Sequence, residues 1–353
     1  MLDGWRGIAI LLVLFDHVTM AIRGAYPAPW TQLGQHGVTI FFVLSGYLIT
    51  ARLVEAPINL KSFYTRRFFR LMPAAWTFLA VLWLLSRATG KPLTTPAEIA
   101  SCVFFYRNMT TVGGWGLAGH FWSLSLEEQF SLVWPCCLLL AGTTRSRWIA
   151  AGGACAVAIY RWHFWAHYNR FGQNIESQVR ADALLVGCLL ALLLADAGMR
   201  TRLSRAMRLL TLPAVIALPV CFAVFHELPP LIESASIAVL IGAVVLRPEA
   251  SGAHVLGVAP LAWLGRISYS VYLWQELFVH MTRGPAALPL LCIGLPCCAL
   301  ASYYLIEQPC IRFARKLEKT QAAHRRLFQN STPNPLTKQT VVERRLARTL
   351  RQS

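Results

Sequence analysis

The feature that most constrains this chain is a series of apolar runs, each close to 20 residues long. A helix that crosses about 30 Å of hydrocarbon needs roughly 20 mostly apolar residues. Several of the runs are short or carry polar residues, so we expect them to pack together with their polar groups facing the inside of a bundle. The sequence therefore predicts an all-α integral membrane protein with about ten transmembrane helices, over residues 5–22, 36–54, 71–88, 121–141, 147–165, 181–198, 206–225, 231–247, 266–282 and 286–306.

The composition supports this class and excludes others. Of the 353 residues, 56% are hydrophobic and only 14% are charged, whereas an ordinary soluble domain is about one quarter charged. These values exclude a soluble globular enzyme, a disordered chain and a disulfide-stapled secreted module. The net charge of +17 would suit a nucleic-acid partner, but Lys and Arg also collect on the cytoplasmic side of membrane proteins. We therefore interpret the charge as a sign of topology and expect no nucleic-acid partner.

Lys and Arg residues are unevenly divided between the segments that join the apolar runs. Alternate segments carry 24 on one side of the membrane and 8 on the other, with Arg6 at the start of the first run. This bias predicts that both termini are cytoplasmic, in a multi-pass protein of a bacterial cytoplasmic (inner) membrane. Residues 1–315 are expected to form the transmembrane domain. Residues 316–353 are expected to form a basic, loosely ordered cytoplasmic tail on anionic membrane lipid.

Ionisable side chains also lie within the runs, where charge costs a few kcal/mol or more. Arg6 and His17 are eleven residues apart, so they share one helix face and are separated by about 16 Å along the axis. Glu127 and Glu128 enter from the other side, and Glu128 lies about 10 Å below the outer boundary, near the depth expected for His17. These groups either clamp two helices together or form a reactive site at mid-membrane.

Two further charged clusters leave the same choice open. Arg67 and Arg70 share a helix face near the cytoplasmic mouth, where they are either an ordinary basic flank or a grip for a phosphorylated ligand. Arg180 and Asp182 open a helix at the outer face, either as a local ion pair that caps the helix or as part of a binding site.

Together these segments resemble the acyltransferase-3 family of integral membrane acyltransferases. The matching motifs follow one another in family order from residue 2 to about 315. They are Leu2–Gly7 leading to His17, Gly37–Ile49, Arg67–Arg70 followed by Pro73, His120–Phe130, Arg180–Gly187, Trp263–Ser270 and Tyr303–Pro309.

The resemblance implies transfer of an acyl group, often acetyl, from cytoplasmic acyl-CoA to a hydroxyl of a carbohydrate or glycosylated acceptor. It also implies that Arg6 and His17 are required and that Arg67 and Arg70 are associated with acyl-CoA, with acetyl-CoA as the expected donor. Gln275 stands where relatives often have His, so we assign it no catalytic role. Residues 307–353 are too few for the SGNH-type domain that some relatives carry, and we expect none.

A mechanism follows as a hypothesis. His17 takes a proton from the attacking hydroxyl, and Glu127 or Glu128 fixes its tautomer and stabilises the imidazolium. Arg6, Arg67 and Arg70 hold the CoA phosphates by charge-assisted hydrogen bonds. Direct transfer is the simpler route, and a covalent acyl-His17 intermediate stays open. The acceptor is expected beside His120, Trp122, Ser123, Arg180 and Asp182.

A membrane transporter or channel for an anionic or acylated metabolite is the competing class. It would also use arginines at its mouth and a buried His–Glu pair. The lack of a visible internal repeat and the basic residues at only one mouth favour the enzyme. We expect no metal site.

Overall fold

The computed structural model describes residues 1–24, 33–55, 59–110, 116–168, 177–223, 230–281, 284 and 288–331. Within these ranges the chain forms helices and no strands. The α-helices are α1 (Leu2–Arg23), α2 (Leu33–Val54), α3 (Leu60–Thr89), α4 (Pro96–Val103), α5 (Phe121–Tyr168), α6 (Ser177–Ala195), α7 (Ala197–Ala223), α8 (Pro230–Leu246), α9 (Ser251–Gly257), α10 (Ala259–Met281), α11 (Leu295–Ala301) and α12 (Gln308–Ser331). Short 3-10 and π turns are η1 (Arg107–Met109), η3 (Leu290–Gly294) and η4 (Ser302–Glu307).

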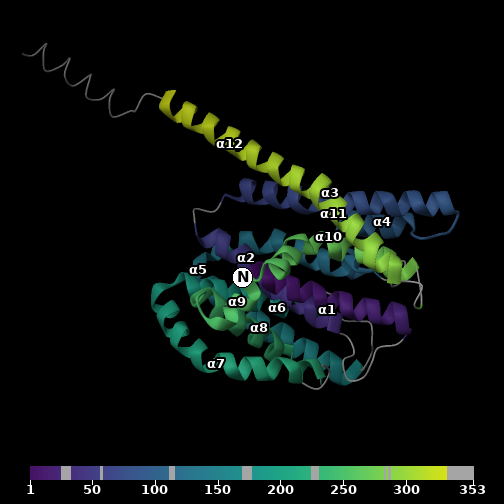
Figure 1. The fold of residues 1–353 in the computed structure, drawn as a ribbon. Coiled ribbons are helices and arrows are strands. Elements are labelled where there is room, and N and C mark those ends of the chain that lie inside the picture. The colour runs from purple at the N-terminus through teal and green to yellow at the C-terminus, as the bar shows by residue number, and fades with distance from the viewer. Residues whose placement is uncertain are drawn as a thin grey trace, which may run out of the picture.

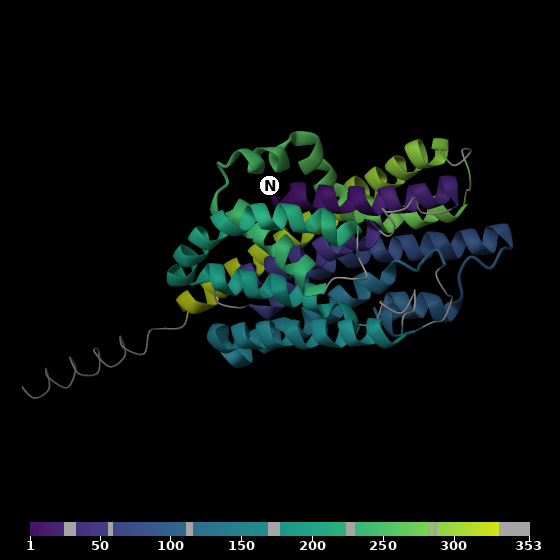
Figure 2. The ribbon, with the colours of Figure 1, turned by 90° about the horizontal axis from the view of Figure 1, so that it is seen from below.

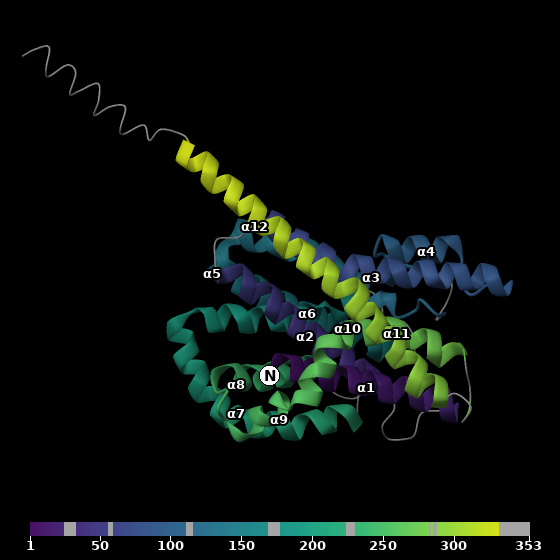
Figure 3. The ribbon, with the colours of Figure 1, turned by 45° about the horizontal axis from the view of Figure 1, so that its top comes forward.

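The long helices run alongside one another in a bundle (Figure 1). In two views α3 and α4 lie on one side and α7 on the other, with α1, α2, α6 and α10 between them (Figures 1 and 3). Helix α12 runs at an angle to the other long helices, with its far end toward the left of the molecule in all three views (Figures 1, 2 and 3). The fold is therefore all-α, as predicted.

Each predicted apolar run lies on helix in the described residues. Within the described part of the chain, six helices are long and apolar enough to cross a membrane by length and composition, namely Leu2–Arg23, Leu33–Val54, Leu60–Thr89, Phe121–Arg161, Ala197–Phe222 and Leu290–Thr320. Two predicted runs are joined in α5, where Gly142 has φ 71° and ψ 171° and so interrupts the helix. The count of ten crossings and the cytoplasmic placement of both termini stay predictions.

Close helix packing depends on two glycines at the contact between neighbouring backbones. A Cβ on Gly265 of α10 would collide with the carbonyl oxygen of Asp3 of α1, and a Cβ on Gly46 of α2 would collide with that of Leu184 of α6. Small residues at such contacts allow membrane helices to approach closely. The α1–α10 contact matters most here, because both helices start at the same level and carry the candidate site farther along.

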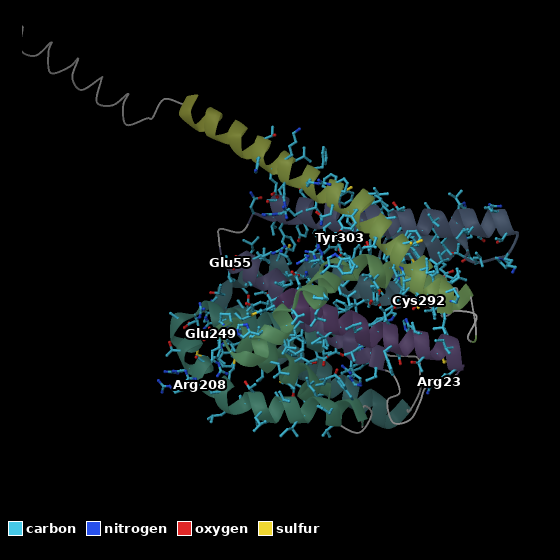
Figure 4. The ribbon with its side chains drawn as sticks, viewed as in Figure 1. Arg23, Glu55, Arg208, Glu249, Cys292 and Tyr303 are labelled. Atoms are coloured by element: carbon cyan, nitrogen blue, oxygen red, sulfur yellow. The ribbon has the colours of Figure 1, made fainter. Side chains whose placement is uncertain are left out.

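The two ends of the bundle differ in charge. Glu55, Arg208 and Glu249 lie at one end, and Arg23 and Cys292 lie at the other (Figure 4). The first end also carries the arginine-rich start of α3 and of α7, as the predicted cytoplasmic side should. We call it the basic end and the opposite one the outer end.

The chain beyond residue 315 differs from the expected loosely ordered tail. Helix α12 continues to Ser331, and its first half packs on α3 through the rings of Phe313 and Phe69, whose centroids are 5.3 Å apart. Residues 332–353 lie outside the described residues.

Candidate functional site

A cavity of about 680 Å³ opens among α1, α2, α3, α5, α10 and α12. Glu55, which lines it, lies at the basic end of the bundle (Figure 4), so the cavity opens toward that end. Six arginines and three glutamates supply its charged lining, namely Arg6, Arg52, Glu55, Arg66, Arg67, Arg70, Glu127, Glu128 and Arg315. The deeper wall is mostly apolar and aromatic. This arrangement suits a ligand with an anionic end and an apolar or uncharged arm.

Arg67, one of the arginines expected to bind an anion, already forms ion pairs with two glutamates. Arg67 Nη2 lies 2.6 Å from Glu128 Oε1 and 3.1 Å from Glu127 Oε1, and Arg67 Nε donates to Glu128 Oε2 at 3.1 Å. Glu127 also accepts a hydrogen bond from Ser45 at 2.8 Å. Arg67 therefore joins α3 to α5, and a phosphate would have to compete with two carboxylates for it.

The two glutamates are thus partners of Arg67 rather than of His17, contrary to the expected pairing. The reason is the depth at which α5 begins. Residues 117–120, which precede the helix, are themselves buried, so α5 starts inside the bundle instead of at its outer surface. Glu127 and Glu128 consequently lie farther toward the basic end than a count from the membrane boundary predicts.

Other arginines of the cavity are better placed to meet an anion. Arg70 makes no ion pair within 4.0 Å among the described residues, and the same holds for Arg52 and Arg315. Arg66 pairs with Glu318 of α12 at 3.0 Å, and Arg6 lies 3.6 Å from Asp3. The sequence interpretation missed Arg52 and Arg315. Arg52 was detectable as the basic residue in the last turn of α2, while Arg315 lies at the edge of the expected tail.

His17 faces a carboxylate on α10 that the sequence interpretation did not select. Its Nδ1 lies 3.3 Å from Glu276 Oε1, and Nδ1 of His280 lies 3.1 Å from Glu276 Oε2. Glu276 is buried, whereas the side chains of His17 and His280 are 26% and 40% exposed. One buried carboxylate therefore lies within ion-pair distance of two histidines that are both partly exposed.

A signal for Glu276 was present in the sequence. It is an acidic residue within the apolar run 266–282, and it lies four positions before His280, on the same helix face. Gln275, one residue earlier, is fully buried and points away from this face. No group of three or more His, Cys, Asp or Glu side chains in the described ranges has the arrangement of a metal site.

The residues expected to contact an acceptor fall into two places. His120 is buried, with its ring 5.5 Å from that of Tyr272, and Ser123 lines the basic-end cavity. Trp122 directly precedes Ser123 on α5, and the Arg180 guanidinium of α6 lies 5.6 Å from its indole centroid.

Arg180 and Asp182 are internal to the bundle. Arg180 is 2% exposed and donates to Gln35 Oε1 at 2.8 Å, while Asp182 is 0% exposed and lies 3.3 Å from Arg161. A neighbouring buried pair joins His36 to Glu233 at 2.9 Å. These contacts connect α2, α5, α6 and α8, so in this structure Asp182 and Arg180 hold helices together.

With this geometry established, comparison with known proteins decides the family. The sequence profile of an acyltransferase domain matches residues 1–305, which is most of the chain. This chain belongs to the acyltransferase-3 family. The matched region contains the cavity-lining arginines of α1, α2 and α3 together with His17 and Glu276, and it ends before α12.

Curated members of the acyltransferase-3 family are similar over most of this chain. The putative peptidoglycan O-acetyltransferase YrhL of Bacillus subtilis is 30% identical, over 87% of this chain and 54% of its own length. The peptidoglycan O-acetyltransferase OatA of Listeria monocytogenes is 27% identical, over 80% and 49%, and a putative O-acetyltransferase of Staphylococcus aureus is 26% identical, over 79% and 51%. The chain spans about half the length of these relatives. No solved structure matches it.

Proposed function

We propose that this chain is a membrane O-acyltransferase that moves an acyl group from cytoplasmic acyl-CoA to a hydroxyl of a carbohydrate or glycosylated acceptor. The observation that carries the proposal is the His17–Glu276 pair, one helical turn beyond the inner end of an arginine-lined cavity. Acetyl is the simplest acyl group, and a cell-envelope glycan is the favoured acceptor, since two of the relatives are named as peptidoglycan O-acetyltransferases.

The donor half of the mechanism uses the cavity. Arg52, Arg70 and Arg315 receive the phosphates of CoA, because none of them forms an ion pair within 4.0 Å among the described residues. The pantetheine arm then extends along the apolar wall toward the outer end. Arg6 and His17 are about 16 Å apart on one face of α1, a distance that an extended pantetheine arm spans.

The chemical half uses His17. Neutral imidazole takes the proton of the acceptor hydroxyl, and the oxygen attacks the thioester carbonyl. Glu276 holds the His17 ring through Nδ1 and stabilises the positive charge that forms on it, the role first assigned to Glu127 or Glu128. We favour direct transfer, since it needs one attack on the acyl carbonyl instead of two. The exposed flanks of His17 and His280 provide the approach for the acceptor.

The test is release of free CoA thiol by purified protein in nanodiscs, with acetyl-, propionyl- and longer acyl-CoAs. We expect thiol release with at least one donor and none with His17→Ala, which removes the base. The matched control is His36→Ala, which removes another histidine that faces a glutamate, in a pair outside the cavity. Movement of labelled substrate into vesicles without thiol release would contradict the enzyme and support the transporter or channel. Thiol release retained in His17→Ala would remove His17 as the base.

A further inference from the structure

Tyr272 lies between the cavity and the histidines. It belongs to α10, is buried, and lines the deep end of the cavity together with Ser123. Its ring faces His120 on the other side, with centroids 5.5 Å apart. Tyr272 is also one turn before Glu276 on the same face of α10, a rise of about 6 Å. A group that reached the end of the cavity would therefore meet the Tyr272 hydroxyl just below the His17–Glu276 pair.

The hydrogen bonds at this point leave the tyrosine proton available. Tyr272 Oη and Ser123 Oγ are 2.7 Å apart, and both lie within reach of the His120 carbonyl oxygen, at 3.3 Å for Tyr272 and 3.1 Å for Ser123. When Ser123 donates to that carbonyl, the Tyr272 hydroxyl can donate elsewhere without leaving the carbonyl unpaired. Each hydroxyl has one hydrogen, so when Ser123 donates to the carbonyl, the Tyr272 O–H is left as the one donor for a ligand oxygen.

A second tyrosine on the same helix provides the contrast. Tyr269 lines the same cavity and donates to the Leu71 carbonyl oxygen at 2.8 Å. No other hydroxyl shares that carbonyl among the described contacts. The Tyr269 hydroxyl therefore donates its hydrogen bond within the fold, whereas the Tyr272 hydroxyl can donate to a ligand instead.

We propose that Tyr272 is a catalytic residue whose hydroxyl donates a hydrogen bond to the carbonyl oxygen of the acyl thioester, with Ser123 as its positioning residue. The inference rests on the proposed function and adds to it the group that stabilises the developing oxyanion. Its basis is the position of the Tyr272 and Ser123 hydroxyls. Both residues line the cavity, and both hydroxyls are within hydrogen-bond distance of the His120 carbonyl oxygen.

The reaction balances without further reagents. His17 accepts the proton of the acceptor hydroxyl, and the new C–O bond forms as the carbonyl electron pair moves onto oxygen, where the Tyr272 O–H meets it. Collapse of this tetrahedral species restores the carbonyl and breaks the C–S bond. The CoA thiolate leaves with the electron pair and takes the proton from His17, which yields the O-acyl product, free CoA and neutral His17.

The experiment compares Tyr272→Phe with Tyr64→Phe, since each change removes one hydroxyl that can donate to a backbone carbonyl and keeps the ring, and Tyr64 is not part of the cavity lining. Loss of one oxyanion donor costs about 10²–10³ in kcat, so Tyr272→Phe should lower kcat for thiol release by that factor. The Kd for CoA, which lacks the thioester carbonyl, should stay unchanged. Tyr64→Phe, which loses the hydrogen bond to the Leu132 carbonyl outside the cavity, should retain kcat.

The outcomes separate this inference from the proposed function. If the wild type binds CoA but releases no thiol from any acyl-CoA, the proposed function fails. If the wild type is active and Tyr272→Phe matches Tyr64→Phe in kcat, the role of Tyr272 is overturned while the enzyme stands. Should Tyr272→Phe fail to fold, Ser123→Ala decides. Without Ser123 the His120 carbonyl competes for the Tyr272 proton, so kcat should fall, and a kcat equal to that of the wild type would contradict the arrangement.

Discussion

At the scale of single residues, the main result is the carboxylate opposite His17. Glu276 is buried and contacts His17 and His280 through its two oxygens, so each histidine ring turns its Nδ1 edge toward the carboxylate. In the proposed mechanism, the other nitrogen of His17 meets the substrate. A carboxylate in this position both fixes the tautomer and stabilises the imidazolium.

Glu276→Gln tests this role. The amide keeps a hydrogen-bonding oxygen but cannot balance the charge on His17, so we expect kcat for thiol release to fall by about 10²-fold with little change in the Kd for CoA. Glu233→Gln is the matched control, because Glu233 pairs with His36 in a buried contact outside the cavity. It should lower thermal stability and leave kcat near the wild-type value. Equal losses of kcat in both variants would indicate a general packing defect instead.

Substitutions of Arg67 and Arg70 test two different roles, helix bridging by Arg67 and donor binding by Arg70. Arg67→Ala leaves two largely buried carboxylates unpaired, and removal of one partner of a buried ion pair costs about 3–5 kcal/mol. We therefore expect a large drop in the melting temperature in detergent. Arg66→Ala is the control, because its pair with Glu318 is more than half exposed on the arginine side and should contribute less than about 1 kcal/mol. An unchanged melting temperature in Arg67→Ala would contradict the bridging role.

Arg70→Ala tests donor binding instead. It removes a cation of the cavity that has no described carboxylate partner, so the fold should be retained. A hydrogen bond to a charged group contributes about 1.5–3 kcal/mol, and the Kd for CoA should rise by about 10-fold or more. Arg87→Ala, in the last turn of the same helix at the outer end, should leave the Kd unchanged. The two Kd values are measured by calorimetry, and equal values would exclude Arg70 from the donor site.

At the scale of elements, α12 is an addition to the acyltransferase-3 match, which ends at residue 305. The helix supplies Ile311, Ala314 and Arg315 to the cavity wall. Its Glu318 contacts both Arg66 and Ser62 on α3. The helix thus contributes Arg315 to the cavity and pairs with Arg66, so it forms part of the wall at the cavity mouth.

Glu318→Gln should release Arg66 toward the cavity. Because the ion pair is partly exposed, the cost in stability should be below about 1 kcal/mol, and the freed cation should lower the Kd for CoA. Asp196→Asn is a matched control, since Asp196 forms a comparable exposed pair with Arg147 at 3.0 Å away from the cavity. A Kd that rises in Glu318→Gln would show that Glu318 helps to form the binding site.

At the scale of the whole molecule, the asymmetry of charge predicts the orientation in the membrane. The basic end carries the arginine-lined cavity and the outer end carries the exposed flank of His280 near the end of α10. If the basic end faces the cytoplasm, donor and acceptor approach the same site from opposite sides of the membrane.

Fusion of alkaline phosphatase, which is active only outside the cytoplasm, tests the orientation. Joined after Lys91, between α3 and α4, it should be active, and joined after Glu249, between α8 and α9, it should be inactive. The reason is that positively charged connecting segments are retained in the cytoplasm. The reverse pattern would invert the protein and place the cavity on the wrong side for cytoplasmic acyl-CoA.

Much of this protein followed from sequence because it depends on local composition. Runs of apolar residues determine which segments become membrane helices, and the positions of Lys and Arg determine which end is basic. The shared face of Arg6 and His17 follows from helical periodicity alone. The family could likewise be identified from short motifs in a fixed order.

Only the tertiary structure decided which groups meet. Whether Glu128 or Glu276 faces His17 depends on the axial position and rotation of helices far apart in the chain, and no local pattern specifies either quantity. The buried turn before α5 moved Glu127 and Glu128 toward the basic end, where Arg67 engages them. The glycine contact between α1 and α10 brought Glu276 to His17. Side chains of one helix can be placed by counting residues, but partners on different helices are fixed only when the backbones pack.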